Sequence, residues 1–392
     1  MSNPLILLRH AEVYAPEPLG LCSLLLGGGR ILWMGDAKDE APRGLPLDEV
    51  DLEGRRLVPG FVDGHVHVTG GGGEGGFASR VPALPLSRYT LGGVTTVIGL
   101  LGTDDCVRST RELLAGLYAL REQGLSAWGY CGGYHLPPVT LTGSVRSDIA
   151  LVEPLIGIGE VAISDHRSSQ PTFDELLRLA AEAHVAGLMS GKAGHVHLHL
   201  GDGARGLELI RRALHESELP ARVWNPTHCN RRTALFDEAV ALAKAGVPVD
   251  FTAFPVDDGE DAYAAEDALL RYLDAGAPPA RVSISSDAGG CLPCFDGDGR
   301  MTHCDIGAPG ALVKTLQALL ARGLPLPSAL PAFTRNVAAQ LRLPHKGGIG
   351  IGFDADLVVL DEHAGIHHVI AGGRWQVRDG RALQHGPFES LS

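Results

Sequence analysis

Two histidines two residues apart are the first feature of the sequence that could do chemistry. His65 and His67 stand in the stretch Val62-Asp63-Gly64-His65-Val66-His67, which follows the apolar run Leu57 to Gly60. In a β-strand, residues i and i+2 point to the same face, so both imidazoles aim at one place. That geometry suits a metal ion, whereas the alternative is a turn in which both rings hydrogen-bond to the backbone.

Other histidines and carboxylates stand at the ends of later strand-like segments. Glu160 stands beside one such segment, and three histidines alternate with apolar residues in His195-Val196-His197-Leu198-His199. His228 and Asp287 directly follow two further segments. Side chains of these types in strand register are hard to explain as separate polar groups within a core. The pattern therefore predicts a metal site where these strand ends meet.

The residue types indicate which metal and which chemistry. Nitrogen and carboxylate ligands without thiolate suit Zn²⁺ or another first-row divalent ion. Four histidines and two carboxylates are too many for one open tetrahedral site. They fit two ions about 3.5–4 Å apart that share a hydroxide and a bridging carboxylate. Such a pair makes a nucleophile at neutral pH and polarises a carbonyl, while an Asp can pass the proton to a leaving amine.

The elements that would position these residues alternate along the middle of the chain. We expect strands at 57–62, 94–98, 126–131, 161–165, 195–200, 221–227, 247–253 and 281–286. Helical patterns lie between most of them, at 107–123, 172–189, 203–217, 233–246 and 261–276. Eight strands alternating with helices predict an α/β fold of the (β/α)8 TIM-like barrel type, in which chemistry lies at the C-terminal strand ends. A doubly wound open sheet is the alternative.

The two ends of the chain have a different pattern. Short strands are expected near the N-terminus at 5–8, 22–26 and 30–34, and near the C-terminus at 355–360, 367–370 and 374–377. Two β segments that flank a long middle predict one small discontinuous β-sandwich domain. We therefore divide the chain into 1–56 (first part of the β-domain), 57–345 (barrel hydrolase domain) and 346–392 (second part of the β-domain).

The composition limits the possible partners and location. The 392-residue chain is 45% apolar and 20% charged, which is ordinary for a globular enzyme, and its net charge of −13 argues against nucleic acid or an anionic membrane as a partner. No secretory signal precedes the first strand, and no apolar run reaches the ~20 residues of a membrane span. Seven cysteines, an odd number, are scattered along the chain, so we expect a reduced, cytoplasmic protein.

These motifs together resemble the amidohydrolase superfamily. The likeness includes the return to the small β-domain through Lys346 to Val359. Within the superfamily, the chain is most similar to the isoaspartyl (β-aspartyl) dipeptidases. The most specific stretches are Gly70–Gly75, Gly99–Asp104, Thr142–Val145, Ala162–Ser168 and Pro226–His228.

The resemblance implies a role for each predicted ligand. His65 and His67 would bind a first divalent metal ion, and His199 and His228 a second, both ions being most simply Zn²⁺. Asp287 would complete the first site and act as the general acid/base. The family usually has a carboxylated Lys as the bridging ligand, at the position of Ala162, whereas here Glu160 stands two residues earlier. Because its stem is shorter, either the strand moves inward, or the metals sit differently, or one site is weak.

The resemblance also implies a substrate site. Glu74 would bind the α-ammonium of a dipeptide and Arg231 its C-terminal carboxylate, while Arg167 and Tyr134 would lie near the free α-carboxylate and the scissile carbonyl. A β-aspartyl dipeptide is a compact zwitterion with one ammonium and two carboxylate groups. Two Arg guanidinium groups match its carboxylates, and one protein carboxylate matches its ammonium group. Tyr134 could donate a hydrogen bond to the developing oxyanion. Cys291 stands where the family has a Ser that helps to hold the C-terminal carboxylate, and a thiol is a weaker donor.

Two other groups of residues are assigned to structure rather than to metal binding. Cys291, Cys294 and Cys304 lack the spacing of a zinc ribbon or finger, so we expect free thiols. His195 and His197 are expected to pack in the barrel with hydrogen bonds rather than to bind metal.

The leading hypothesis is a binuclear metallo-dipeptidase that cleaves the isopeptide amide of β-aspartyl dipeptides by attack of a metal-bound hydroxide. One alternative is another amidohydrolase acting on a cyclic amide or an N-acyl amino acid, of the dihydroorotase or aminoacylase type. The other is a non-catalytic relative that binds a small zwitterion. The resemblance also implies a homo-oligomer, and the expected partner is a small dipeptide.

Overall fold

A closed ring of parallel strands forms the centre of the molecule. The computed structural model describes residues 5–389 apart from 37–38, 40–43, 45 and 296. The sheet order β6-β7-β8-β9-β10-β11 is continued by the pair β12-β13. The strands are β6 (Phe61–Val66), β7 (Val94–Gly99), β8 (Ser126–Cys131), β9 (Leu155–Ile163), β10 (Val196–Leu200), β11 (Trp224–Thr227), β12 (Val249–Thr252) and β13 (Val282–Ser285).

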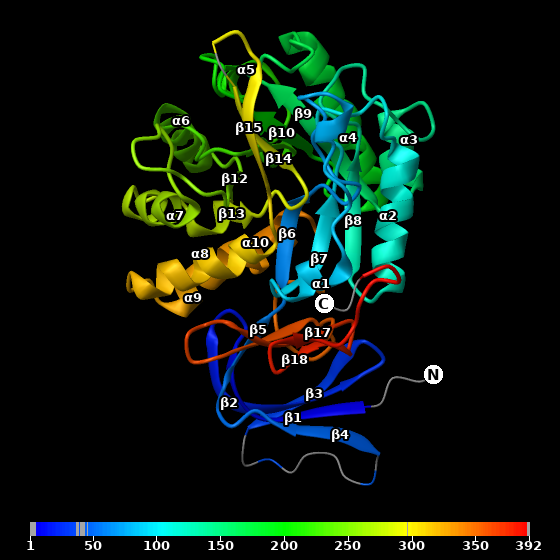
Figure 1. Cartoon of the computed structure of the whole chain (residues 1–392), viewed down its shortest axis with the longest axis vertical. Coiled ribbons are helices and arrows are strands. Elements are labelled where there is room, and N and C mark those ends of the chain that lie inside the picture. Colours follow the sequence, from blue (N-terminus) through cyan, green and yellow to red (C-terminus); the bar gives the residue numbers. More distant parts are fainter. Residues whose placement is uncertain (1–4, 37–38, 40–43, 45, 296, 390–392) are drawn as a thin grey trace.

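Two contacts close the ring. The amide of Cys229, after β11, donates to the carbonyl of Asp250 in β12 at 3.1 Å. Val66 at the end of β6 forms a parallel bridge with Ala288, just after β13. The (β/α)8 barrel expected from the alternating pattern is therefore confirmed (Figure 1).

The barrel strands are buried on both faces, which explains their nearly continuous apolar sequences. Every residue of β9 is buried, and so is every residue of β7. Inward residues of the first four strands, including Val62 and Tyr130, pack against Val337 of the short helix α10 (Arg335–Gln340). The barrel interior is thus a packed core and not a pore, and polar side chains gather elsewhere along the strands.

Helices follow the strands and cover the barrel. The longer ones are α2 (Thr110–Glu122), α3 (Val145–Leu151), α4 (Phe173–Ser190), α5 (Glu208–Glu216), α6 (Thr233–Lys244), α7 (Ala265–Asp274) and α8 (Gly310–Ala321). Short helices are α1 (Leu86–Thr90) and α9 (Leu326–Ala329). In α4, Thr172 and Glu175 form a capping box, and Gly191 with a φ of 73° ends the helix. All five predicted helices are present, whereas α1, α3, α8, α9 and α10 were not predicted.

Strands from both ends of the chain form one separate sheet. From the N-terminal part come β1 (Leu5–Tyr14), β2 (Pro18–Gly27), β3 (Arg30–Asp36), β4 (Leu47–Asp51) and β5 (Arg56–Pro59). From the C-terminal part come β16 (Leu357–Leu360), β17 (Ile366–Ala371), β18 (Arg374–Arg378) and β19 (Arg381–Ala382). The order is β19-β18-β17-β16-β5-β1-β2-β3, with β4 paired to β1 (Figure 1). The exact domain boundaries stay a prediction.

The strand expected at 57–62 is divided between the two sheets. Its first half is β5 of the outer sheet and its second half begins β6 of the barrel, with Gly60 between them. A Cβ atom at Gly60 would lie 2.1 Å from Oγ1 of Thr95, so only glycine fits where the chain passes from one sheet to the other.

A hairpin that the sequence did not predict follows the last barrel strand. It consists of β14 (Cys291–Phe295) and β15 (Met301–Ile306), coloured yellow in Figure 1. A Cβ atom at Gly75 would lie 2.3 Å from Cε of Met301, so this hairpin packs on the glycine-rich loop of residues 70–76. Within the described residues, none of the helices combines the length and apolar character that crossing a bilayer demands.

Candidate metal centre

Six side chains from five barrel strands meet at the C-terminal end of the barrel. They come from β6 or the residues after it, from β9, from β10, and from the residues after β11 and β13: His65, His67, Glu160, His199, His228 and Asp287. None is more than 5% exposed. They form three overlapping groups in which one ligand atom from each residue lies within 4.8 Å of the others. The structure therefore brings together all the residues for which metal binding was predicted.

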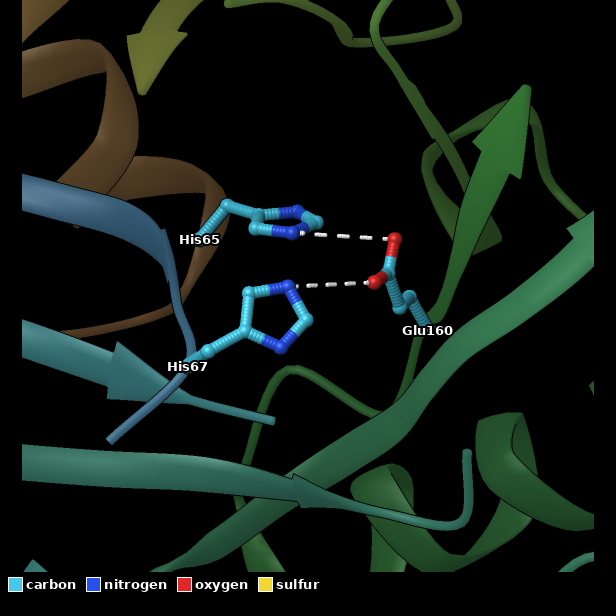
Figure 2. A group of neighbouring side chains, drawn as sticks. All are labelled: His65, His67 and Glu160. Carbon is cyan, nitrogen blue, oxygen red and sulfur yellow. Dashed lines mark ion pairs between the residues drawn. The ribbon is translucent and has the colours of Figure 1, made fainter. Parts of the chain in front are cut away.

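One half of the centre is formed by His65, His67 and Asp287. Asp287 Oδ1 lies 3.3 Å from His65 Nε2 and 3.1 Å from His67 Nε2. Figure 2 shows that both imidazoles also face Glu160. His67 Nε2 lies 3.4 Å from Glu160 Oε1, and His65 Nε2 lies 3.6 Å from Oε2.

The other half is formed by His199 and His228. His199 Nδ1 lies 3.0 Å and His228 Nε2 lies 3.5 Å from Glu160 Oε2. The Glu160 carboxylate therefore stands between the two halves, with Oε1 toward His67 and Oε2 toward the second pair of histidines. This is the position that a bridging ligand would take.

A β-bulge explains how the short Glu160 side chain reaches the centre. Val196 of β10 pairs with Ile158, whereas Leu198 pairs with Val161, so β9 has one extra residue between these pairs. Bulges next to active sites re-aim side chains. A Cβ atom at Gly159 would lie 2.7 Å from His197 Cβ, so glycine is required beside Glu160. Of the possibilities left open by the sequence, a local change of the strand is the one that the structure favours.

Charges inside the centre support one another despite complete burial. Burial alone would lower the pKa of His67, but Asp287 and Glu160 raise it to about 10. Burial favours the neutral form of Asp287, yet His65 and His67 hold its pKa well below the usual range. In the same way, His65 and His199 outweigh burial and keep the pKa of Glu160 low. Buried carboxylates that stay charged need cations beside them, and either protons on histidines or metal ions can supply the charge.

The residues fit a pair of divalent metal ions. His65 Nε2 and Asp287 Oδ1 are buried and have no hydrogen-bond partner among the described residues. His228 Nδ1 lies 2.7 Å from the Thr252 hydroxyl oxygen, which leaves Nε2 for a metal. His199 Nε2 lies 3.0 Å from Asp165 Oδ2, so Nδ1 is the nitrogen on the side of the centre, where it lies 3.0 Å from Glu160 Oε2 and 2.9 Å from the Tyr134 hydroxyl oxygen. Imidazoles whose second nitrogen is hydrogen-bonded in this way, together with carboxylates, are typical ligands of zinc sites.

Three residues around the centre were not assigned from the sequence: Asp63, Asp165 and Thr252. Asp63 in β6 accepts hydrogen bonds from the Ser286 amide at 3.1 Å and from its hydroxyl group, which ties β6 to the residue before Asp287. Burial raises the pKa of Asp63 to about 7. The signal was present for Asp63, because it shares a strand face with His65 at a spacing of two.

The predicted substrate-binding residues border the metal centre. Glu74 Oε1 accepts from the Thr103 hydroxyl group at 2.9 Å and lies 3.1 Å from Arg167 Nη1. The guanidinium of Arg167 also forms a forked ion pair with Asp165, at 3.0 and 2.7 Å. These contacts hold one acidic and one basic group beside the second pair of histidines.

Tyr134 and Arg231 approach the same histidine. The Tyr134 hydroxyl oxygen lies 2.9 Å from His199 Nδ1. Burial, together with Glu160, raises the pKa of Tyr134 well above its usual value, so the hydroxyl keeps its proton at neutral pH. Arg231 Nη1 donates to the Leu200 carbonyl at 3.0 Å and lies 3.4 Å from His199 Nε2. Both side chains can therefore offer hydrogen bonds to a ligand at this edge of the centre.

The expectation of a free thiol at Cys291 is wrong. Cys291 in β14 forms a disulfide with Cys304 in β15, so its sulfur has no proton to donate to a carboxylate. The hairpin register that brings these residues together leaves no trace in their spacing along the sequence. The side chain of Cys294 lies outside the described part of the chain, and Cys22, Cys106, Cys131 and Cys229 are free.

His195 and His197 lie in β10 with His199 and are buried. Neither belongs to a group of possible metal ligands among the described residues. His197 instead hydrogen-bonds to other side chains, as the sequence predicted.

Comparisons with known proteins agree with this geometry. The chain is 38% identical to the β-aspartyl dipeptidase of Fervidobacterium islandicum AW-1, solved with a β-Asp-Leu dipeptide, with a TM-score of 0.92 over 97% of this chain and 98% of the other. It is 28% identical to an imidazolonepropionase of Salinispora arenicola, over 89% of each chain. It is 24% identical to an adenine deaminase of Geobacillus kaustophilus, over 85% of this chain and 52% of the relative. Residues 56–376 match the model of the amidohydrolase family, and the chain belongs to that family.

Proposed function

We propose that this amidohydrolase uses two divalent metal ions to cleave the isopeptide amide of β-aspartyl dipeptides. The observation that carries the proposal is the placement of Glu74, Arg167 and Arg231 around the buried centre. One carboxylate and two guanidinium groups match a small molecule with one ammonium and two carboxylate groups. The likeness to a dipeptidase that was solved with β-Asp-Leu supports the same substrate class.

Each charged side chain has one part of the substrate to bind. The Glu74 carboxylate binds the α-ammonium group, and its existing contact with Arg167 places the free α-carboxylate of the same aspartyl unit beside that guanidinium. Arg231 binds the carboxylate of the leaving residue. Because these three contacts define the two ends of the dipeptide, the amide between them lies over the metal centre.

The reaction needs a proton carrier and a donor to the carbonyl oxygen. The metal pair, when bound, supplies a nucleophile at neutral pH and polarises the carbonyl group. Asp287, held as a carboxylate beside His65 and His67, accepts a proton and returns it to the departing amine. The protonated hydroxyl group of Tyr134 donates a hydrogen bond to the oxygen on which negative charge develops.

A nitrogen-containing ring is the second candidate substrate, because the relatives with sequence identity of 24–28% include imidazolonepropionases and adenine deaminases. Imidazolonepropionate has one carboxylate and no ammonium group, and adenine has neither, so these rings would not use Glu74, Arg167 and Arg231 together. The three side chains therefore separate the two candidates.

A direct assay tests the proposal. The protein is purified with Zn²⁺, its bound metal is counted, and β-Asp-Leu is compared with imidazolonepropionate, adenine, dihydroorotate and N-acetyl-leucine. We expect two metal ions per chain and hydrolysis of β-Asp-Leu alone. Two bound metals with no hydrolysis of any β-aspartyl dipeptide would overturn the proposal.

Two variants sharpen the assay. Asp287→Asn should lower kcat by at least about 100-fold, the low end of general acid–base contributions. Asp237→Asn, on the exposed face of α6, is the matched control and should leave kcat unchanged. Full turnover by Asp287→Asn would refute the proton-carrier role.

A further inference from the structure

A chain of hydrogen bonds connects His65 of the metal centre to the main-chain carbonyl of Pro248. His65 Nδ1 lies 2.9 Å from His197 Nε2, and His197 Nδ1 lies 2.6 Å from Asn225 Oδ1. Asn225 Nδ2 donates to the carbonyl oxygen of Pro248 at 3.3 Å. The three side chains come from β6, β10 and β11, and each is at most 3% exposed. This hydrogen-bond chain therefore crosses the barrel interior away from water.

The chemistry of the last acceptor fixes the direction of every bond. A main-chain carbonyl only accepts, so the amide nitrogen of Asn225 faces Pro248 and its oxygen faces His197. That oxygen also only accepts, so His197 carries its proton on Nδ1. Among the described residues, the His197 ring hydrogen-bonds to His65 and Asn225 and pairs with no carboxylate, so nothing would compensate a positive charge on this buried ring, and its Nε2 is a lone pair. His65 must then donate from Nδ1.

The consequence falls on the opposite nitrogen of His65. Because Nδ1 is engaged with His197, Nε2 is the nitrogen left for a metal ion, and this atom lies 3.3 Å from Asp287 Oδ1 and 3.6 Å from Glu160 Oε2. It is also buried without a hydrogen-bond partner among the described residues. Nε2 therefore faces the place where the first metal ion would bind.

We propose that His197 and Asn225 are positioning residues that fix the tautomer and ring orientation of His65 for metal binding. Histidine ligands almost always have such a partner on their second nitrogen. His199 has the carboxylate of Asp165 and His228 has the hydroxyl group of Thr252. His65 depends instead on a neutral imidazole, which could accept or donate, so a second residue must set its direction. The proposal rests on the proposed metal centre but not on the proposed substrate.

The metal affinity of three variants tests the proposal. His197→Leu removes the acceptor and should weaken Zn²⁺ or Co²⁺ binding at one of the two sites by about 10–100-fold, measured by competition with a chelator. His197→Gln keeps an acceptor at a similar reach and should recover most of the affinity. Asn225→Leu should have a smaller effect than His197→Leu, because His197 can still accept from His65 in one of its two tautomers.

His195→Leu is the matched control. His195 is a buried imidazole on the same strand, its ring packs on Tyr130, and its Nε2 has no partner among the described residues. Its removal should disturb packing to a similar degree without changing either metal affinity. Equal losses of affinity in His195→Leu and His197→Leu would show that the effect is only structural and would overturn the proposal.

Nitrogen NMR of the metal-free protein provides a readout that does not depend on activity. In ¹⁵N-histidine-labelled wild-type protein, we expect His65 and His197 to carry their protons on Nδ1. An Nδ1 without a proton on either ring would refute the proposal, even if variants at position 197 fail to fold. Failure to cleave β-Asp-Leu would refute the proposed substrate but would leave the tautomers and metal affinities as measured.

Discussion

A single carboxylate carries much of the chemistry at the scale of individual residues. Glu160 lies within 3.0–3.6 Å of four histidine nitrogens through two different oxygens. In the proposed pair of metal sites, an ordinary glutamate would thus take the bridging position without any chemical modification. The two halves of the centre are consequently coupled, because any change of charge at Glu160 is felt by His65, His67, His199 and His228.

Glu160→Gln tests this coupling. The amide keeps the shape of the side chain but removes its charge and one acceptor oxygen. We expect the variant to retain at most one tightly bound metal ion after dialysis and to lose at least ~100-fold in turnover, the upper limit for residues that only support a ligand. Glu182→Gln, on α4 at the surface, should keep two ions and full turnover. A Glu160→Gln protein with two ions and normal kcat would exclude a bridging role.

The raised pKa of His67 predicts how the metal-free protein responds to pH. Its folded-state pKa is about 10, above the usual 6.5, so the protonated ring stabilises the fold fully below pH 6.5. That stabilisation is lost as the pH rises through 10. We therefore expect the Tm of the metal-free protein to fall between pH 6.5 and 10 and that of the Zn²⁺-loaded protein to change less.

Calorimetry can follow the same proton during metal binding. Zn²⁺ must displace it from His67 at neutral pH, so binding should release protons and weaken as the pH falls. Titrations in buffers of different ionisation enthalpy measure the number released. No net release at pH 7 would show that His67 is already neutral in the metal-free protein.

At the scale of the elements, the bulge in β9 positions the Glu160 side chain. The extra residue lies between Ile158 and Val161, where Gly159 leaves no space for a Cβ atom beside His197. A second glycine, Gly102, lies on the other side, and a Cβ atom there would be 2.7 Å from His67 Cε1 and 3.2 Å from Glu160 Oε1. The absence of side chains at Gly159 and Gly102 therefore leaves the space in which the Glu160 carboxylate contacts the His67 imidazole.

Gly159→Ala tests the bulge. The added methyl group would lie 2.7 Å from His197 Cβ and 2.9 Å from its carbonyl oxygen, so the strand has to shift. We expect a loss of about 1–3 kcal/mol in the free energy of unfolding, as for other overpacked sites, together with weaker metal binding. Gly116→Ala in α2 is the control, since its Cβ would meet Val68 Cγ2 at an ordinary 3.5 Å. Unchanged metal affinity in Gly159→Ala would separate the bulge from the metal centre.

The strands and their ligands could be predicted because their signals are local. Alternation in His195–His199 and the spacing of His65 and His67 follow directly from the period of a strand. The bulge could not be predicted, because it depends on the pairing of β9 with β10 and leaves no pattern in the sequence. The same holds for the bond between Cys291 and Cys304, which requires the unpredicted hairpin β14–β15.

At the scale of the whole molecule, two cations connect the barrel to the outer sheet. Lys346 follows α10, is 7% exposed, and pairs with Asp356 and, at 2.7 Å, with Asp354. It also donates to the hydroxyl group of Ser126, the first residue of barrel strand β8. Arg335 in α10 pairs with Glu17, but these side chains are 44% and 62% exposed. The two contacts join the same parts of the molecule and differ mainly in burial.

Lys346→Met and Arg335→Met measure what burial contributes to this junction. Removing the buried ammonium group leaves the buried carboxylate of Asp356 without its cation, whereas Asp354 keeps its ion pair with Arg30. We expect this to lower the free energy of unfolding by about 3–5 kcal/mol. The exposed pair is screened by water, so its loss should lower it by at most about 1 kcal/mol. With an unfolding entropy of about 2.1 cal/mol/K per residue, these values correspond to decreases in Tm of about 4–6 °C and about 1 °C.

Ser126 begins its strand, whereas the metal centre lies at the opposite strand ends, so turnover of β-Asp-Leu at 25 °C should be normal in both variants. Equal Tm values for the two variants would show that the junction is held by apolar packing and not by the buried charge.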